Sequence, residues 1–184
     1  MIRGDSTDYD LLEKWTKNFD CMGYKSCEIG VREGLGSKII MDNVLNNYIH
    51  VGVDPYGNLK YQHYDDSPEY TCDYTDEMRD TMLNDFKQYR NQGRFTLCNM
   101  TDTQFMNDSE HRHSKFAFVH FDGPHMTKDV MTEAVWFANR SVPGTRFVFD
   151  DHSKYEMSTI ANVLTLYDFK TIEMGDNKCL LEKQ

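Results

Sequence analysis

The segment from Cys27 to Ser37, CEIGVREGLGS, places three glycines directly after a short apolar run. Glycines at positions 30, 34 and 36 let the backbone turn sharply and present N–H groups to a ligand. Their spacing differs from the G-x-G-x-x-G of dinucleotide-binding folds, and no Gly-Lys-Ser/Thr sequence follows as in a phosphate-binding loop. The segment therefore predicts a strand, a turn and a helix, in which the turn is either a ligand site or only a tight connection.

Apolar extended segments alternate with amphipathic helical segments on both sides of this turn. After the strand that ends at Gly30, the expected strands cover residues 49–54, 94–100, 116–123 and 145–152, with two short ones within 170–184. The expected helices cover residues 7–19, 37–48, 75–93, 126–144 and 155–169. Such alternation is typical of an α/β fold. We expect a doubly wound, mostly parallel seven-stranded sheet with one antiparallel edge strand, contributed by the C-terminal pair.

The length of 184 residues suits one domain with one core. We expect a single domain over residues 1–184, in which residues 1–24 form an N-terminal helical cap. Residues 58–76 are rich in Tyr, Asp and His and lack apolar periodicity, so we expect a long loop there. Long loops in compact domains often cover binding sites, which makes residues 58–76 a candidate lid.

Acidic residues follow several of the expected strands, at the sheet edge where α/β proteins bind ligands. Asp54 follows the second strand, Asp122 the fourth, and Asp150 and Asp151 the fifth. The carboxylate of Asp54 can accept hydrogen bonds from both hydroxyls of a ribose, although it could instead only start the turn at Pro55. Together with the glycine turn, Asp54 indicates a ligand that contains a nucleoside.

Asp122, Asp150 and Asp151 form a second candidate site. Three carboxylates suit a hard divalent ion such as Mg²⁺, Mn²⁺ or Ca²⁺, which lowers the pKa of a bound hydroxyl. One acid of the 150–151 pair could alternatively cap the next helix. His125 lies three residues after Asp122 and could be a general base near neutral pH or a structural helix cap. We expect His125 and Asp122 to be the catalytic residues.

The composition favours some classes of binding partner and one type of cellular compartment over others. The chain has 30 acidic against 20 basic residues, a net charge of -10, which argues against nonspecific nucleic-acid binding. The sequence has no apolar stretch long enough to span a membrane. Five cysteines without a C-x-x-C pair fit a reducing compartment, so we expect a cytoplasmic protein without disulfides. The expected partner is a small molecule, and homo-oligomer formation stays open.

Four segments in strand order resemble the motifs of class I S-adenosylmethionine-dependent methyltransferases, most closely the small metal-dependent O-methyltransferases of the catechol and macrocin type. The segments are EIGVREGLGS, HVGVDPYG, FVHFDGPHMTKDV and PGTRFVFDDH, and they extend to His152. The resemblance implies a Rossmann-like methyltransferase fold. It also implies methyl transfer from S-adenosylmethionine to the hydroxyl group of a small substrate, assisted by a divalent metal, with Mg²⁺ the expected ion.

The resemblance implies roles for individual residues. Its cofactor-binding positions are Glu28, Gly30, Gly34, Gly36, Ser37, Asp54, Thr101, Asp102 and Asp122. Its metal ligands are Asp122, Asp150 and Asp151. His125 takes the position at which catechol-type enzymes carry a lysine base.

Three alternatives remain on sequence grounds. The first is a domain of the same fold that binds S-adenosylmethionine or a protein partner without catalysis. The second is a dinucleotide-dependent oxidoreductase, against which the glycine spacing speaks. The third is a metal hydrolase, against which the absence of an Asp-x-Asp pair after the first strand speaks.

Overall fold

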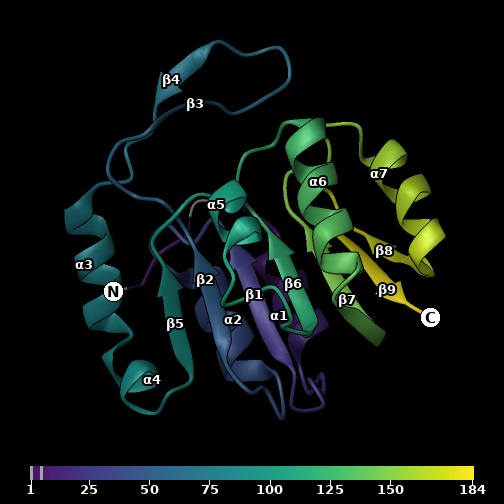
Figure 1. The fold of residues 1–184 in the computed structure, drawn as a ribbon, viewed down its shortest axis with the longest axis horizontal. Helices are drawn as coiled ribbons and strands as arrows, with labels where there is room; N and C mark the ends of the chain where they lie inside the picture. The colour runs from purple at the N-terminus through teal and green to yellow at the C-terminus, as the bar shows by residue number, and fades with distance from the viewer. Residues whose placement is uncertain (1, 5) are drawn as a thin grey trace.

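A seven-stranded sheet in the order β5-β2-β1-β6-β7-β9-β8 forms the centre of the protein (Figure 1). The computed structural model describes residues 2–4 and 6–184. The strands of the sheet are β1 (Lys25–Ile29), β2 (His50–Val53), β5 (Phe95–Cys98), β6 (Phe116–Phe121), β7 (Ser141–Phe149), β8 (Phe169–Met174) and β9 (Cys179–Lys183). Only β9 runs antiparallel, between β7 and the edge strand β8. The predicted fold class, a mostly parallel α/β sheet of seven strands, is confirmed.

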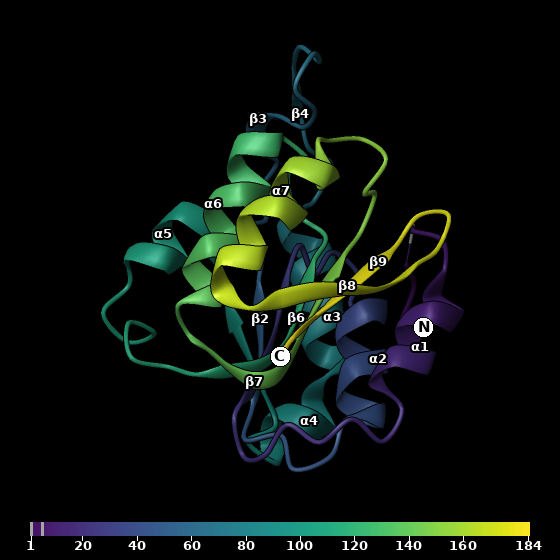
Figure 2. The ribbon, with the colours of Figure 1, turned by 90° about the vertical axis from the view of Figure 1, so that its right-hand side faces the viewer.

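Helices cover both faces of the sheet. The helices are α1 (Tyr9–Thr16), α2 (Leu35–Asn43), α3 (Asp76–Asp85), α4 (Lys87–Asn91), α5 (Asp102–Asn107), α6 (Thr127–Ala138) and α7 (Met157–Leu164). Figures 1 and 2 show α5, α6 and α7 on one face and α1, α2 and α3 on the other. Because both faces are covered, the central strands β2 and β6 are buried along their whole length.

Local sequence explains several boundaries. The side chain of Thr75 accepts a hydrogen bond from the Met78 N–H group and so begins α3. Thr101 and Gln104 form a capping box at the start of α5. The single helix expected over residues 75–93 is divided into α3 and α4 at Phe86, whose ring is completely buried.

The N-terminal helix α1 packs against the sheet and not over its carboxyl edge. Leu12 and Trp15 of α1 join Phe118 and Val148 of the sheet in one hydrophobic cluster. The part of the expected N-terminal cap that reaches the carboxyl edge is the segment before α1, which includes Ser6.

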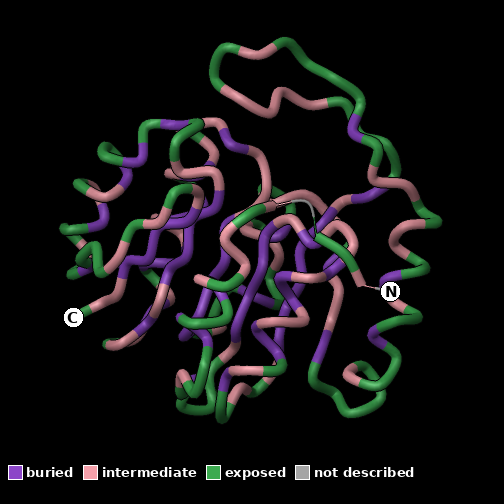
Figure 3. Tube along the Cα trace, turned by 180° about the vertical axis from the view of Figure 1, so that it is seen from behind, coloured by how far each residue is buried: buried purple, intermediate pink, exposed green. Residues whose placement is uncertain are grey.

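The segment expected to be a loop at 58–76 contains a small antiparallel hairpin of β3 (Lys60–Gln62) and β4 (Glu69–Thr71). The hairpin lies apart from the main sheet, above its carboxyl edge (Figure 1). Its backbone is mostly exposed or half-buried, whereas the sheet is buried (Figure 3). The Tyr61 and Tyr70 side chains pair across its strands, with hydroxyl oxygens 3.0 Å apart. A cross-strand pair of tyrosines, one on each short strand, explains why a hairpin forms here without apolar periodicity.

Candidate functional site

A cavity of about 400 Å³ lies at the carboxyl ends of β1, β2, β5 and β6, beneath the hairpin. Five of the predicted cofactor-binding residues line it, namely Gly30, Asp54, Thr101, Asp102 and Asp122. The hairpin contributes further walls, including Tyr61, Gln62, His63 and Glu69. The residues after four neighbouring strands and the hairpin therefore enclose one space, which we call the first cavity.

The glycine turn requires glycine where it approaches the loop after β6. Gly30 has a φ of +84°, and a Cβ atom there would lie 2.0 Å from the carbonyl oxygen of Asp122. A side chain at position 30 would therefore separate the two strand ends that line the first cavity. Gly34 has a φ of +92° and begins α2, away from the cavity, where it packs on Phe86 and Met82.

Asp54 fastens the glycine turn to the end of β2. Its Oδ2 atom accepts hydrogen bonds from the N–H groups of Val31 (3.0 Å) and Arg32 (2.9 Å), and its Oδ1 atom from that of Tyr56 (3.1 Å). The carboxyl group is only 1% exposed, and this burial raises its pKa. Since a carboxylate has about four acceptor positions, three are used within the protein and one remains for a ligand.

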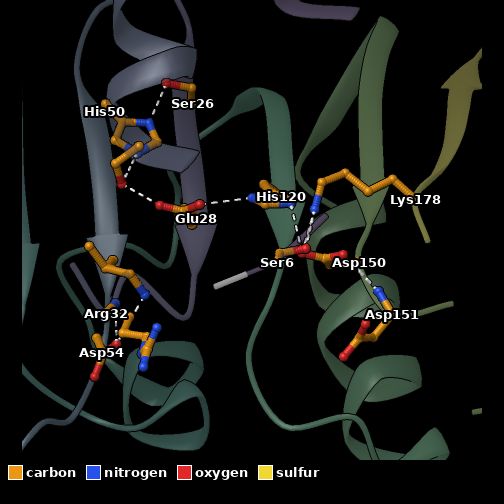
Figure 4. A network of polar contacts seen from close by, with 12 residues as sticks. Ser6, Ser26, Glu28, Arg32, His50, Asp54, His120, Asp150, Asp151 and Lys178 are labelled. Carbon is orange, nitrogen blue, oxygen red and sulfur yellow. Dashed lines mark hydrogen bonds and ion pairs between the residues drawn. The ribbon is translucent and has the colours of Figure 1, made fainter. Parts of the chain in front are cut away.

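The other four predicted cofactor-binding residues lie outside the wall of the first cavity. Ser37 of α2 donates to the buried carboxylate of Glu28, and His120 donates to the same carboxylate through Nδ1 at 2.8 Å (Figure 4). A Cβ atom on Gly36 would lie 2.0 Å from Glu28 Oε1, so glycine makes room for this carboxylate. Gly34 is the fourth of these residues.

The Glu28 carboxylate ends a directed chain of hydrogen bonds that crosses from β2 to β6. The single proton of the Ser37 hydroxyl goes to Glu28, so Ser37 accepts from His50 Nε2 (2.9 Å). His50 Nδ1 in turn accepts from the Ser26 hydroxyl (2.8 Å). This buried chain holds β1, β2, β6 and α2 in register under the first cavity.

A second, smaller cavity of about 300 Å³ adjoins the first. Its walls include His63, Tyr74 and Asp122, which also line the first cavity. The remaining walls come from the segment before α1, the hairpin, the loops after β6 and β7, and the turn before β9. They are Ser6, Thr7, Tyr64, His125, Asp151 and Asn177. Two cavities therefore meet at Asp122.

His125 is held between aromatic rings on the wall of the second cavity. Its ring stacks on those of Tyr64 and Tyr155, with interplanar angles of 17° and 8°. Its Nδ1 atom lies 3.1 Å from Nε2 of His63, while its Nε2 atom is buried without a hydrogen-bond partner. Burial, and then the neighbouring His63, lower the pKa of His125 to about 3. The imidazole is therefore neutral at physiological pH.

The hairpin is fastened to this site by the residues around His63. The backbone N–H of His125 donates to the carbonyl of His63 (2.8 Å). The carboxylate of Asp65 accepts from the N–H (3.1 Å) and the hydroxyl (2.6 Å) of Thr127. The hairpin thus brings an imidazole to His125 and closes one side of both cavities.

Two of the three acids expected to hold a metal, Asp150 and Asp122, have different surroundings. Asp150 is fully buried, and its carboxylate forms an ion pair with Lys178 and accepts from Asn177 Nδ2 (2.6 Å). Burial alone would raise the pKa of Asp150, but His120 and Lys178 lower it below its ordinary value. Burial and the charge of Asp150 raise the pKa of Asp122.

This donor set does not fit a divalent cation. The Lys178 ammonium group is paired with Asp150 and would lie beside a metal bound there, and like charges repel. Within the described part of the chain, one set of possible metal ligands at this edge has its ligand atoms within 4.8 Å of one another. It consists of Glu28, His120 and Asp122, and not of the expected three acids. Glu28 and His120 are already bonded to each other. The expected ligand role of Asp150 is therefore not supported.

Sequence reasoning missed His63, Asn177 and Lys178. His63 lies in a segment without periodicity, and only its pairing with His125 in space reveals it. Lys178 belongs to the turn before β9, where a single lysine is normally exposed. It is buried because β9 inserts beside β7 and brings the turn against Asp150, which no local pattern indicates.

Comparison with known proteins identifies the family of this chain. The family described as "Methyltransferase domain" matches residues 27–152. No curated protein matches the chain significantly. An O-methyltransferase from Bacillus cereus, solved with SAH, has a TM-score of 0.65 at 10% identity and covers 98% of this chain and 81% of its own.

Two further solved structures share the fold. The N-methyltransferase NodS from Bradyrhizobium japonicum WM9 has a TM-score of 0.56 at 12% identity, over 96% of this chain and 90% of its own. An rRNA methylase from Streptococcus thermophilus has a TM-score of 0.54 at 9% identity, over 100% and 98%. At such identities these likenesses concern the fold alone, but the family match covers most of the chain. The chain belongs to the class I S-adenosylmethionine-dependent methyltransferases.

Proposed function

We propose that this protein transfers a methyl group from S-adenosylmethionine to a hydroxyl group of a small substrate. The observation that carries the proposal is the pair of adjoining cavities that share Asp122, His63 and Tyr74. A methyl donor in the first cavity and an acceptor in the second would meet at this shared wall. Direct transfer requires the two reactants to be held in line within contact distance.

The first cavity suits the donor. The remaining acceptor position of Asp54 is available to a ribose hydroxyl, and Thr101 and Asp102 line the wall next to it. Gly30 permits close approach of the methionine end to the backbone. S-adenosylhomocysteine bound to solved neighbours of this fold, such as the Bacillus cereus enzyme, supports the same ligand class here.

The second cavity suits a small polar acceptor. At about 300 Å³, its walls carry hydroxyl, carboxyl, imidazole and amide groups. Although one neighbour is an rRNA methylase, the net charge of -10 favours a small molecule over a polyanion. The hairpin over residues 58–76 is proposed as the lid that excludes water from both cavities.

His125 is proposed as the general base. In the tautomer in which Nδ1–H donates to His63, the Nε2 atom, which is buried without a hydrogen-bond partner, keeps its lone pair for the proton of the acceptor. As the acceptor oxygen attacks the methyl carbon, the carbon–sulfur bond breaks and its electrons stay on sulfur. The hydroxyl proton moves to His125 Nε2 and is later lost to solvent. The products are the methyl ether and S-adenosylhomocysteine.

The test combines calorimetry with a turnover assay. S-adenosylhomocysteine is titrated into wild type, and labelled S-adenosylmethionine is then offered with a panel of small hydroxylated compounds. His125→Gln is expected to bind S-adenosylhomocysteine normally but to lose about 10²–10⁴-fold in turnover. The matched control His113→Gln alters an exposed histidine and is expected to behave as wild type.

Two outcomes would redirect the proposal. Absence of S-adenosylhomocysteine binding to wild type would contradict the donor site. Binding without turnover of any panel compound would favour the alternative reading, a domain that binds the cofactor or a partner without catalysis.

A further inference from the structure

A buried ammonium group lies among the acids at the carboxyl edge of the sheet. The side chain of Lys178 is 0% exposed and forms an ion pair with Asp150 (Figure 4). Its Nζ atom also donates to the hydroxyl of Ser6 (2.9 Å) and lies 5.1 Å from the centre of the Tyr9 ring. A lysine is almost never fully buried unless it is paired. Asp150, Ser6 and Tyr9 therefore form a buried site for the ammonium group of Lys178.

Three donors of the protein itself bind the Asp150 carboxylate. Besides Lys178, it accepts from Asn177 Nδ2 (2.6 Å) and from the backbone N–H of Asp151 (2.8 Å). The nearest nitrogen of the neighbouring His120 is 3.9 Å away. A divalent ion bound at Asp150 would lie beside the buried ammonium group of Lys178, and if it displaced that group it would leave the lysine charge without a partner, which costs several kcal/mol.

Lys178 pairs with Asp150, one of the three acids that the sequence resemblance assigns to the metal. We propose that Lys178 is the built-in counter-cation of the acid cluster and stands in place of a divalent metal. The site therefore needs no metal for its integrity. On the proposed methyltransferase function, on which this consequence rests, turnover needs none either. Deprotonation of the acceptor then depends on His125 and not on a metal-bound hydroxyl.

Lys178 acts as a positioning residue, since it lines neither cavity. Through Asp150 it fixes the loop that carries Asp151, and through Ser6 it fixes the segment before α1. Ser6 and Asp151 both line the second cavity. The ammonium group, together with the Asn177 side chain, which also donates to Ser6 and Asp150, thus holds two walls of the proposed acceptor site.

The first experiment uses the unaltered protein. Mn²⁺ and Mg²⁺ are titrated into wild type by calorimetry, with and without S-adenosylhomocysteine, and melting temperature is recorded with EDTA and with excess metal. We expect no stoichiometric metal binding and no metal-dependent shift of the melting temperature. Stoichiometric Mn²⁺ binding that is lost in Asp150→Asn would overturn the proposal. S-adenosylhomocysteine binding in the same titrations tests the cofactor site separately, so the two proposals fail independently.

The second experiment removes the ammonium group. Lys178→Met keeps the apolar stem but leaves Asp150 unpaired, so Mn²⁺ is expected to bind at least about tenfold more tightly than to wild type and to raise the melting temperature of the variant. The matched control Lys170→Met alters an exposed lysine of β8 and is expected to bind no metal. A folded Lys178→Met protein with no gain in Mn²⁺ affinity would overturn the proposal. If that variant does not fold, the wild-type titration still decides the question.

Discussion

Replacing Asp54 with alanine is expected to loosen the glycine turn itself, and not only to remove a contact with ribose. Alanine leaves the N–H groups of Val31, Arg32 and Tyr56 without acceptors in a buried site. An unsatisfied buried N–H group costs about 1–3 kcal/mol, and relief of the buried charge offsets part of this. At the lower value for each group, we expect a loss of about 3 kcal/mol in the free energy of unfolding.

That loss is a large share of the stability of a typical domain, which is about 5–15 kcal/mol. Urea unfolding of wild type and Asp54→Ala measures it, and calorimetry with S-adenosylhomocysteine measures the effect on binding. Asp54→Asn is the matched control, because its amide oxygen can still accept from Val31 and Arg32 while its NH₂ group faces the N–H of Tyr56. We expect it to lose about half as much stability as Asp54→Ala.

A free energy of unfolding of Asp54→Ala within about 0.5 kcal/mol of the wild-type value, the range of ordinary surface substitutions, would refute this role of Asp54. Weakened S-adenosylhomocysteine binding at unchanged stability would instead mean that Asp54 serves the ligand alone. Equal losses in the alanine and asparagine variants would show that the two N–H groups of the turn contribute little.

Three further changes test other parts of the site. Burial, and then His120, lower the pKa of His50 to about 3. Below about pH 6.5 the unfolded chain therefore binds a proton that the folded protein does not, and the free energy of unfolding decreases as the pH is lowered. His50→Gln should therefore lose about 2 kcal/mol less than wild type between pH 7.5 and 5 in urea unfolding, and an equal loss would contradict this. Gly36→Ala forces a methyl group against Glu28, and we expect a loss of about 1–3 kcal/mol by the same assay, whereas unchanged stability would rule out the close approach. Asp65→Ala frees the hairpin from Thr127, so hydrogen exchange over residues 58–76 should accelerate while the melting temperature moves by less than about 2 °C; unchanged exchange would mean that other contacts hold the hairpin.

Much of this architecture can be predicted because each local pattern agrees with the final fold. The alternation of apolar runs with helical segments predicts the sheet, and the acids after β2, β6 and β7 predict which edge carries the site. Asp54 and Asp122 line the first cavity because residues that follow parallel strands meet at one edge.

The remainder depends on pairings between distant segments. Glu28 and Ser37 satisfy each other in a buried chain, which the sequence cannot distinguish from a cavity wall. Asp150 pairs with Lys178, which lies 28 positions later in the chain, because the turn before β9 packs against it. A motif states which side chains are near an edge, but it does not state which of them are already paired.

None of the helices in the described ranges is long and apolar enough to cross a bilayer. The five cysteines are all buried as free thiols. Burial raises the pKa of Cys27 and Cys98 above the ordinary thiol value, and therefore keeps both thiols protonated and weakly reactive.

The contact between Ser6 and Lys178 joins positions 172 residues apart. During synthesis, which proceeds from the N-terminus, β1, β2, β6 and β7 leave the ribosome before the turn that carries Lys178. Until that turn packs beside β7, the Asp150 carboxylate lacks its cation and the Ser6 hydroxyl lacks its ammonium partner. The turn between β8 and β9 thus completes the charge balance of the site, while the two strands beside it complete the sheet.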